Sequence, residues 1–309
     1  MTRRLLPLIL AVLALEGQRA DIRIDIGLVT VPCSITDRTG APVKNLRIQD
    51  FLLKDNGRTR KIEHLWQESE LPLTIGLVVD VSGSQSAFVD RHRETVAQFL
   101  TQVLGPEDHA FLVTVAGEVK LLTDLTGSPN ELRAGVRAID PFQRHGTLLG
   151  EPCRGQCGGT ALWNAVYAAA NQKMHWIQGR KALIILSDGM DTGSPHSLPD
   201  AVESAQEAET VVYAIKYVDP TLALTRRERS DRSLERLTDL TGGYTFLNPE
   251  DQVGSVFARI EKELRSLYVL GFTPPVEARD GRFHKLQVAM VRRGLRVRTR
   301  NGYYAALRN

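Results

Sequence analysis

The sequence predicts an α/β protein built on a doubly wound, mainly parallel, Rossmann-like sheet, with a small β-sandwich beside it. Two observations predict this class. Between residues 70 and 268, apolar runs of strand length alternate with stretches of helical periodicity, as in βαβ units whose helices cover both faces of a parallel sheet. Residues 21–70 and 268–309 instead alternate apolar and polar positions between turns, as half-buried antiparallel strands do.

Residues 1–20 have the pattern of a secretory signal peptide. Arg3 and Arg4 precede an apolar run that ends at Leu15, and small and polar residues follow it. A basic start and an apolar run of this length are typical of export signals, and the run is too short to span a bilayer. A buried N-terminal helix is the alternative. We therefore expect an exported protein, periplasmic or secreted, without a transmembrane span in the mature chain.

The composition is that of a globular protein with a full core. The 309 residues are 42 % hydrophobic and 24 % charged, which is ordinary for one large domain or two smaller ones. The formal net charge is +3, and removal of residues 1–20 takes away three arginines and one glutamate and leaves +1. A nearly neutral chain gives no electrostatic reason to expect a nucleic-acid partner.

The two terminal segments are expected to combine into one sandwich, because each is too short to bury a β core alone. Residues 28–35 form the first expected strand, in which Pro32 favours an edge or a bulge. Residues 51–66 are expected to form a hairpin, since Asn56-Gly57 supplies the positive φ angles of a tight turn. The C-terminal segment adds expected strands at 268–272, 282–291 and 295–299.

The central domain is expected to alternate strands and helices from residue 73 onward. Its expected strands are 73–79, 110–115, 119–122, 181–187, 210–217 and 244–246. Its expected helices are 86–104, one starting at Ser128-Pro129, 160–176, 199–209, 229–241 and 250–267. At the second of these helices, the serine is expected to cap the helix and the proline to occupy its first turn.

The last expected strand carries Arg296, Arg298 and Arg300 at alternate positions, so these side chains share one face. We interpret this stripe as a solvent-facing strand face. Contact with an anionic surface is the alternative.

The cysteines are Cys33, Cys153 and Cys157. Export permits disulfides. Cys153 and Cys157 lie four residues apart in a glycine-rich loop, so a local bridge between them is favoured over a bridge to Cys33. A zinc site is the alternative, but it needs further soft ligands, and His145 is the one potential ligand nearby in the sequence.

Three oxygen-bearing residues follow the first strand of the central domain. The stretch I-G-L-V-V-D-V-S-G-S places Asp80, Ser82 and Ser84 at alternate positions, and in an extended backbone such residues point the same way. A turn in which a serine caps the next helix would explain the stretch equally well. Ligands of open α/β sheets bind at the carboxyl ends of the strands, where this stretch is expected to lie.

Two other loops offer oxygens at the same edge. Thr160 opens a helix after Gly158-Gly159, and Asp188 follows the strand 181–187. Two carboxylates and three hydroxyls, with room for water, suit Mg²⁺, and Mn²⁺ or Ca²⁺ can replace it. Thr147 is not expected to take part because no helix follows it. Asp191 lies beyond the strand end and is expected at most to support the ligands.

This constellation resembles the metal-ion-dependent adhesion site of von Willebrand factor A-type domains, whose pattern is D-x-S-x-S with a distant threonine and a distant aspartate. The resemblance spans residues 70–265 and implies a von Willebrand A-type fold. It also implies that five residues are the metal ligands: Asp80, Ser82, Ser84, Thr160 and Asp188.

The flanking segments resemble the VWFA-related family first described from acidobacterial genomes. The similar stretches include V-T-V-P-C-S-I-T-D-R-T-G before the domain and L-Y-V-L-G-F-T-P, R-F-H-K-L-Q-V and R-N-G-Y-Y after it. In that family the flanking strands form a small β-sandwich. The resemblance therefore implies that segments 21–70 and 268–309 form a sandwich beside the α/β domain at 70–268, after the signal peptide expected at 1–20.

Two functions fit this sequence. The first is a non-enzymatic adhesion or assembly module, in which the metal binds an exposed Asp or Glu of a protein partner. The second is a metal-dependent hydrolase of the cell envelope. The sequence contains no H-E-x-x-H, no G-x-S-x-G and no phosphate-binding glycine loop, so we favour the binding module.

Overall fold

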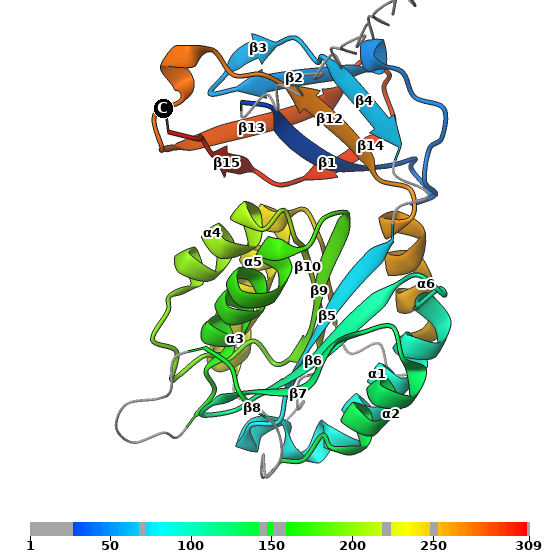
Figure 1. Ribbon diagram of the computed structural model, residues 1–309, viewed down its shortest axis with the longest axis vertical. Coiled ribbons are helices and arrows are strands. Elements are labelled where there is room, and N and C mark those ends of the chain that lie inside the picture. Colours follow the sequence, from blue (N-terminus) through cyan, green and yellow to red (C-terminus); the bar gives the residue numbers. More distant parts are fainter. Residues whose placement is uncertain are drawn as a thin grey trace, which may run out of the picture.

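A computed structural model describes residues 27–67, 72–141, 147–150, 159–217, 224–247 and 253–307. The expected signal peptide at 1–20 and both cysteines of the expected disulfide, Cys153 and Cys157, lie outside the described residues. Figure 1 shows two units, a layered α/β domain and a pair of antiparallel sheets stacked at one end of it.

The α/β domain is built on a mainly parallel sheet. Within the described residues the sheet has seven strands in the order β11-β10-β9-β5-β6-β7-β8. The last two strands of that order run antiparallel to their neighbours. Its strands are β5 (Leu73–Asp80), β6 (His109–Val115), β7 (Val119–Thr126), β8 (Thr147–Leu148), β9 (Arg180–Ser187), β10 (Val211–Lys216) and β11 (Thr245–Leu247). All residues of β5 and β9 are buried, as expected for central strands covered on both faces.

Helices cover both faces of this sheet (Figure 1). One face packs against α1 (Val89–Val103), α2 (Pro129–Arg137) and α6 (Val253–Leu264). The other packs against α3 (Leu162–Ala168), α4 (Leu198–Glu207) and α5 (Leu224–Thr241). As predicted, Ser128 caps α2, and its side chain accepts a hydrogen bond from the N–H of Glu131. The helix expected over 160–176 is not uniform, because a π-helical turn (Ala169–Lys173) and a 3₁₀ turn (Met174–Trp176) follow α3.

The antiparallel sheets combine strands from both ends of the chain. One has the order β14-β1-β12-β4 and the other β15-β13-β2-β3. Their strands are β1 (Val29–Thr36), β2 (Phe51–Asp55), β3 (Arg58–Arg60), β4 (His64–Gln67), β12 (Tyr268–Phe272), β13 (Phe283–Met290), β14 (Arg296–Thr299) and β15 (Gly302–Tyr304). Val31 of β1 pairs with Leu270 of β12, and both side chains are fully buried in the core between the sheets.

The expected hairpin over residues 51–66 forms only in part. Asn56 and Gly57 adopt positive φ angles, as predicted, and β3 pairs with β2. The strand then stops at Arg60, and β4 pairs with β12 in the opposite sheet. The chain therefore crosses from one sheet to the other within this segment, which places Ile62 in the core.

The arginine stripe of β14 is not a solvent-facing surface, so that prediction was wrong for two of its three residues. Arg300 is buried, and its guanidinium donates to the carbonyl oxygens of Gln206 in α4 (2.7 Å) and Thr30 in β1 (2.6 Å). Arg298 donates to the carbonyl of Gly243 (2.6 Å) and lies over the ring of Tyr244. Arg296 alone is exposed. Arg298 and Arg300 thus form hydrogen bonds that join the sandwich to the α/β domain.

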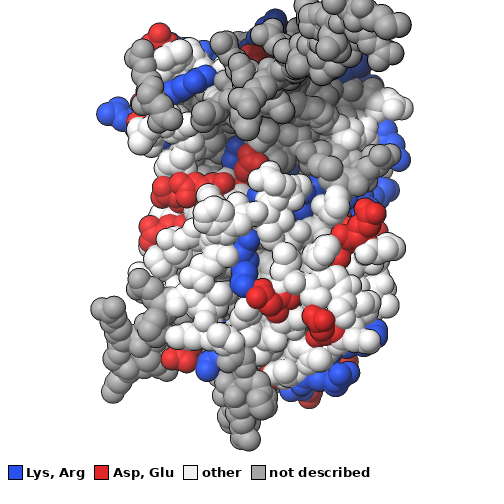
Figure 2. Space-filling view, in the orientation of Figure 1, with Lys and Arg blue, Asp and Glu red and all other residues white. Residues whose placement is uncertain are grey.

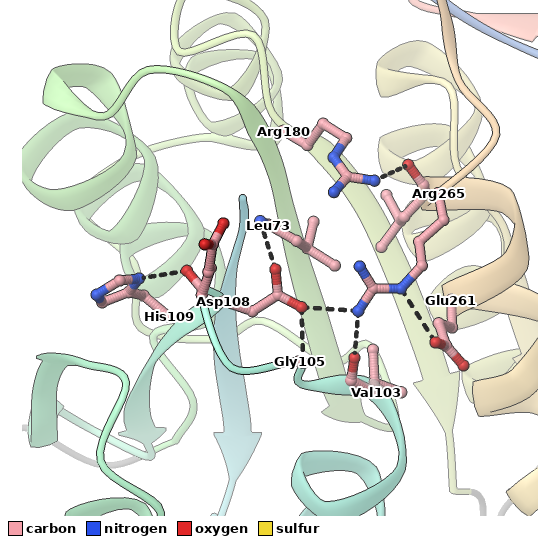
Figure 3. Close-up of polar contacts among 10 residues, drawn as sticks. Leu73, Val103, Gly105, Asp108, His109, Arg180, Glu261 and Arg265 are labelled. Carbon is pink, nitrogen blue, oxygen red and sulfur yellow. Dashed lines mark hydrogen bonds and ion pairs between the residues drawn. The ribbon is translucent and has the colours of Figure 1, made fainter. Parts of the chain in front are cut away.

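A charged cluster around Asp108 and Arg265 lies at the edge of the α/β domain that faces the sandwich (Figure 3). The carboxylate of Asp108 accepts hydrogen bonds from the N–H groups of Leu73 and Gly105, each at 2.8 Å, and from Arg265 at 2.7 Å. Arg265 also donates to the carbonyl of Val103 (2.8 Å). These contacts join the starts of β5 and β6 to the ends of α1 and α6, where the chain enters and leaves the domain.

Candidate metal centre

The strand β5 ends in a buried carboxylate with two bonded oxygens. Asp80 is its last residue and has no exposed surface. One carboxylate oxygen accepts the backbone N–H of Ser82 (2.9 Å), and the other accepts the hydroxyl of Ser187 (2.5 Å). The position of Asp80 is therefore fixed both by its own loop and by the neighbouring strand.

The two serines after Asp80 are not used as ordinary helix caps. Ser82 stands at the N-cap of a 3₁₀ turn (Gly83–Phe88), but its side chain makes no capping hydrogen bond. Its hydroxyl oxygen instead lies 3.3 Å from that of Ser84. The capping alternative raised by the sequence is therefore wrong. The two hydroxyls lie together as expected, but Ser84 is in the 3₁₀ turn, so the extended backbone assumed for the stretch ends before it.

The end of β9 lies beside the end of β5. The register pairs Val79 with Leu186, so Asp80 and Ser187 follow at adjacent positions. The Ser187 hydroxyl accepts the N–H of Gly189 (3.0 Å) while it donates to Asp80. Asp188 comes next, is 2 % exposed, and accepts the N–H of Met190 (2.9 Å). Two carboxylates thus lie at the ends of neighbouring parallel strands.

Thr160 is buried in the loop before α3 and is tied to the loop that follows Asp188. Its carbonyl accepts the N–H groups of Thr192 (3.0 Å) and Gly193 (3.1 Å). The next residue, Ala161, donates its N–H to the carbonyl of Ala116 (2.7 Å), just beyond the end of β6. The three loops predicted to share one edge of the sheet therefore do so, at the end of the domain that is remote from the sandwich (Figure 1).

The chain resembles known proteins in its three-dimensional structure. No family model matches the chain, and no curated protein sequence matches it either. Proximal thread matrix protein 1 from the mussel byssus, solved with a zinc-occupied MIDAS motif, is 14 % identical and matches 68 % of this chain and 49 % of its own, with a TM-score of 0.50. The α/β domain has the von Willebrand A-type fold. At this identity the likeness establishes the fold alone, and the chain spans about half of the byssus protein.

Two further solved structures resemble the chain. BatB from Bacteroides thetaiotaomicron is 14 % identical and matches 63 % of this chain and all of its own, with a TM-score of 0.48. A von Willebrand factor type A protein from Catenulispora acidiphila is 12 % identical and matches 86 % of this chain and 75 % of its own, also at 0.48.

Burial affects the titratable groups at this edge of the von Willebrand A-type domain. Burial raises the pKa of Asp80 to about 7; the hydroxyls of Ser187 and Ser82 oppose this rise, and the neighbouring Asp188 carboxylate adds to it. His92 lies 3.1 Å from the carbonyl oxygen of Asp80, but burial lowers its pKa to about 4, so it is neutral at pH 7 and supplies no positive charge. A divalent ion would relieve the repulsion between the two carboxylates.

The donor set fits a hard cation. Two carboxylates and three hydroxyls are oxygen ligands of the kind that Mg²⁺, Mn²⁺ and Ca²⁺ prefer. Within the ranges that the structure describes, no group of three or more His, Cys, Asp or Glu side chains is placed to hold a metal. A site at the strand ends would therefore have to rely on Ser82, Ser84 and Thr160 as well as the aspartates.

Sequence reasoning missed one contributor to this edge, Ser187, and expected at most a supporting role for another, Asp191. Ser187 bonds Asp80 directly, and its role follows only from the register of β5 against β9. Asp191 accepts the N–H of Trp163 at the start of α3 (3.1 Å), and burial raises the pKa of Asp191.

Two other residues singled out in the sequence lie outside this cluster of loops. Thr147 lies in the short strand β8, and Cys33 is a buried free thiol in β1.

Proposed function

We propose that this protein is an exported, non-enzymatic binding module that attaches to a carboxylate of a partner protein through a divalent cation. The ion would be held by Asp80, Ser82, Ser84, Thr160 and Asp188. The observation that carries the proposal is the pair of buried carboxylates on adjacent strand ends, beside two serine hydroxyls that cap no helix. The byssus protein of the same fold, with its zinc-occupied MIDAS motif, supports a metal at this place.

The bound ion would supply an electrophilic position for an acidic side chain. Mg²⁺ takes six oxygen ligands, and five protein residues leave at least one position for water or a partner. Two carboxylates balance a divalent charge, so an added Asp or Glu from outside is attracted without strong repulsion. The role of this chain is to orient the ligands, through Ser187 and the backbone N–H groups that hold the two aspartates.

Surface charge and helix composition are compatible with an exported binding module. Acidic and basic side chains are interspersed on the described surface visible in Figure 2. None of the helices in the described part of the chain has the length and apolar character needed to cross a bilayer. We propose that residues 1–20 direct export to the periplasm or beyond.

Calorimetric titration of the mature protein with Mg²⁺, Mn²⁺, Ca²⁺ and Zn²⁺ tests the metal site. Asp80→Ala is expected to abolish binding, because it removes one of two carboxylates from the site. Asp124→Asn is the matched control, because this carboxylate lies in the exposed salt bridge to Lys173. Unchanged Mg²⁺ affinity in Asp80→Ala would refute the site.

The carboxylate partner is tested separately. Protein captured from envelope extract on the immobilised chain should require Mg²⁺, be released by EDTA, and be lost in Asp188→Ala. An Asp-containing loop peptide of the captured partner should compete, whereas the same peptide with Asn should not. A partner that binds equally well without metal would refute the mechanism, and Mg²⁺-dependent hydrolysis of phosphoester or peptide substrates would point to the hydrolase instead.

A further inference from the structure

Residues 191–194, in the loop after Asp188, are hydrogen-bonded to the segment that carries Thr160. We call residues 191–194 the Asp191 turn. The hydroxyl of Thr192 accepts the N–H of Thr160 (3.1 Å), while the N–H groups of Thr192 and Gly193 both donate to the Thr160 carbonyl. The backbone of Thr160 is therefore bonded on both its N–H and its C=O side to one short turn.

The Asp191 turn also supplies the cap that α3 lacks. The N-cap residue of α3 is Ala161, which has no side chain able to bond the first free N–H groups. Asp191 accepts the N–H of Trp163 (3.1 Å), and Ser194 accepts the N–H of Asn164 (2.9 Å). The Ser194 hydroxyl also donates to the same oxygen of Asp191. A remote loop thus anchors the start of the helix that follows Thr160.

The residue before Thr160 packs closely against the Asp191 turn. Gly159 has a φ of +103°, and a Cβ added there would lie 2.1 Å from the Thr192 hydroxyl oxygen. A side chain at position 159 would therefore displace the turn from the backbone of Thr160. The main chain on both sides of Thr160 therefore contacts the Asp191 turn.

We infer that the Asp191 turn is a positioning element of the metal site, which holds the Thr160 hydroxyl where it completes the donor set. This inference rests on the proposed function. Groups that orient a metal ligand without touching the metal commonly change metal affinity when they are removed. Asp191 contributes through its hydrogen bonds to Trp163 and Ser194, and its carboxylate does not itself bind the ion.

The first test compares Asp191→Ala with Asp191→Asn in the full mature chain, with Mg²⁺ affinity measured by calorimetry and Mn²⁺ affinity by electron paramagnetic resonance. Asp191→Ala is expected to weaken binding by about tenfold to a hundredfold. Asp191→Asn keeps an oxygen acceptor for both bonds and is expected to stay within about threefold of wild type. An equal loss in both variants would overturn the positioning role, because it would show that charge matters and the hydrogen bonds do not.

Ser128→Ala is the matched control. It removes the cap of α2, which lies elsewhere in the domain, so it is expected to lower the melting temperature without changing metal affinity. A loss of metal affinity in this control as large as that of Asp191→Ala would overturn the inference, because any weakened helix start would then have the same effect.

The decisive test asks whether Asp191 acts through Thr160. Thr160→Val removes the hydroxyl and keeps the backbone bonds, and it is expected to weaken metal binding. In that background Asp191→Ala should weaken binding by less than about twofold more, because there is no longer a hydroxyl to position. If Asp191→Ala costs as much affinity in the Thr160→Val chain as in wild type, the inference is wrong.

Failure of this inference is distinguishable from failure of the proposed function. If Asp80→Ala binds metal as wild type does, the metal site itself is wrong. If Asp80→Ala abolishes binding while Asp191→Ala leaves it unchanged, the site stands and the positioning role falls. Should Asp191→Ala not fold, as judged by circular dichroism, Thr192→Val takes its place, since it removes the acceptor of the Thr160 N–H and predicts the same loss.

Discussion

Asp108→Asn tests whether the charged cluster in Figure 3 holds the α/β domain together. The side chain of Asp108 is 5 % exposed, and its two oxygens accept from Leu73, Gly105 and Arg265. Asparagine has the same shape but a single acceptor oxygen. It can keep the bonds to Gly105 and Arg265, but it then faces the N–H of Leu73 with its own N–H₂ group.

The expected cost follows from that geometry. One buried N–H loses an ionised acceptor, which costs about 1.5–3 kcal/mol. The ion pair with Arg265 loses its negative partner, but Arg265 is one-third exposed, so we add only about 0.5–1 kcal/mol. The sum is a loss of roughly 2–4 kcal/mol, a large share of the 5–15 kcal/mol that stabilises an ordinary domain.

The cost should depend on pH in a defined direction. Burial alone would raise the pKa of Asp108, but the N–H groups of Gly105 and Leu73 and the guanidinium of Arg265 outweigh it and hold the pKa below 3.8. A lowered pKa means that the carboxylate stabilises the fold fully above about pH 4 and loses this effect as the pH falls through the folded-state value. The gap between wild type and variant should therefore be large at pH 7 and shrink as the pH falls through the lowered folded-state pKa of Asp108.

Urea unfolding followed by far-UV circular dichroism measures this gap, because the helices reported by that signal, α1 to α6, belong to the α/β domain. Asp124→Asn is the control: its salt bridge to Lys173 is at 2.7 Å, but its side chain is 67 % exposed, so a loss below about 1 kcal/mol is expected. An Asp108→Asn chain as stable as the control, or a gap that does not change with pH, would refute the reasoning.

Three further predictions follow from the sandwich and the cysteines. Arg300→Met should split unfolding into two transitions, because it removes the hydrogen bonds from Arg300 to Gln206 in one unit and to Thr30 in the other. Calorimetry should show one transition for wild type and for the exposed-site control Arg296→Met. A single unshifted transition in Arg300→Met would contradict this prediction. A chain limited to residues 70–268 should unfold at lower temperature than the mature chain, and equal stability would show that the flanking strands contribute nothing. Cys153 and Cys157 should be bridged in the exported protein, so alkylation of the unfolded, unreduced chain should label one thiol by mass spectrometry, whereas three labelled thiols rule the bridge out.

The strands and the metal-site edge were predictable because they depend on local pattern. A buried parallel strand such as β9 is an unbroken apolar run, and the carboxyl ends of parallel strands meet at one edge whatever the order of the strands. The alternate spacing of Ser82 and Ser84 predicted that their hydroxyls lie together, although Ser84 lies in a 3₁₀ turn rather than an extended strand. That the three loops meet at this edge follows from the order of strands and helices, which is why the sequence was informative there.

Contacts between distant segments were not predictable in the same way. Arg298 and Arg300 alternate as exposed residues would, and nothing local shows that an α/β surface lies against them. Asp108 follows Gly105-Pro106 and has the appearance of an ordinary turn residue, although it accepts the N–H that starts β5. Such roles depend on how the two units meet and on which strand starts lie side by side. The resemblance of the flanking segments to the VWFA-related family stays a prediction.

The placement of the two chain connections has a mechanical consequence. The sandwich joins the α/β domain at the start of β5 and beyond the end of α6, whereas the proposed metal ligands lie at the far end of β5. A partner pulling on the ion would place tension along the length of β5, parallel to its neighbours β6 and β9. The force would act on the sheet in shear, so that many interstrand hydrogen bonds of β5 would bear it together. In a peeling geometry those hydrogen bonds would instead break one after another. If the proposed metal site binds a partner, a pull between that partner and the sandwich would therefore act along β5.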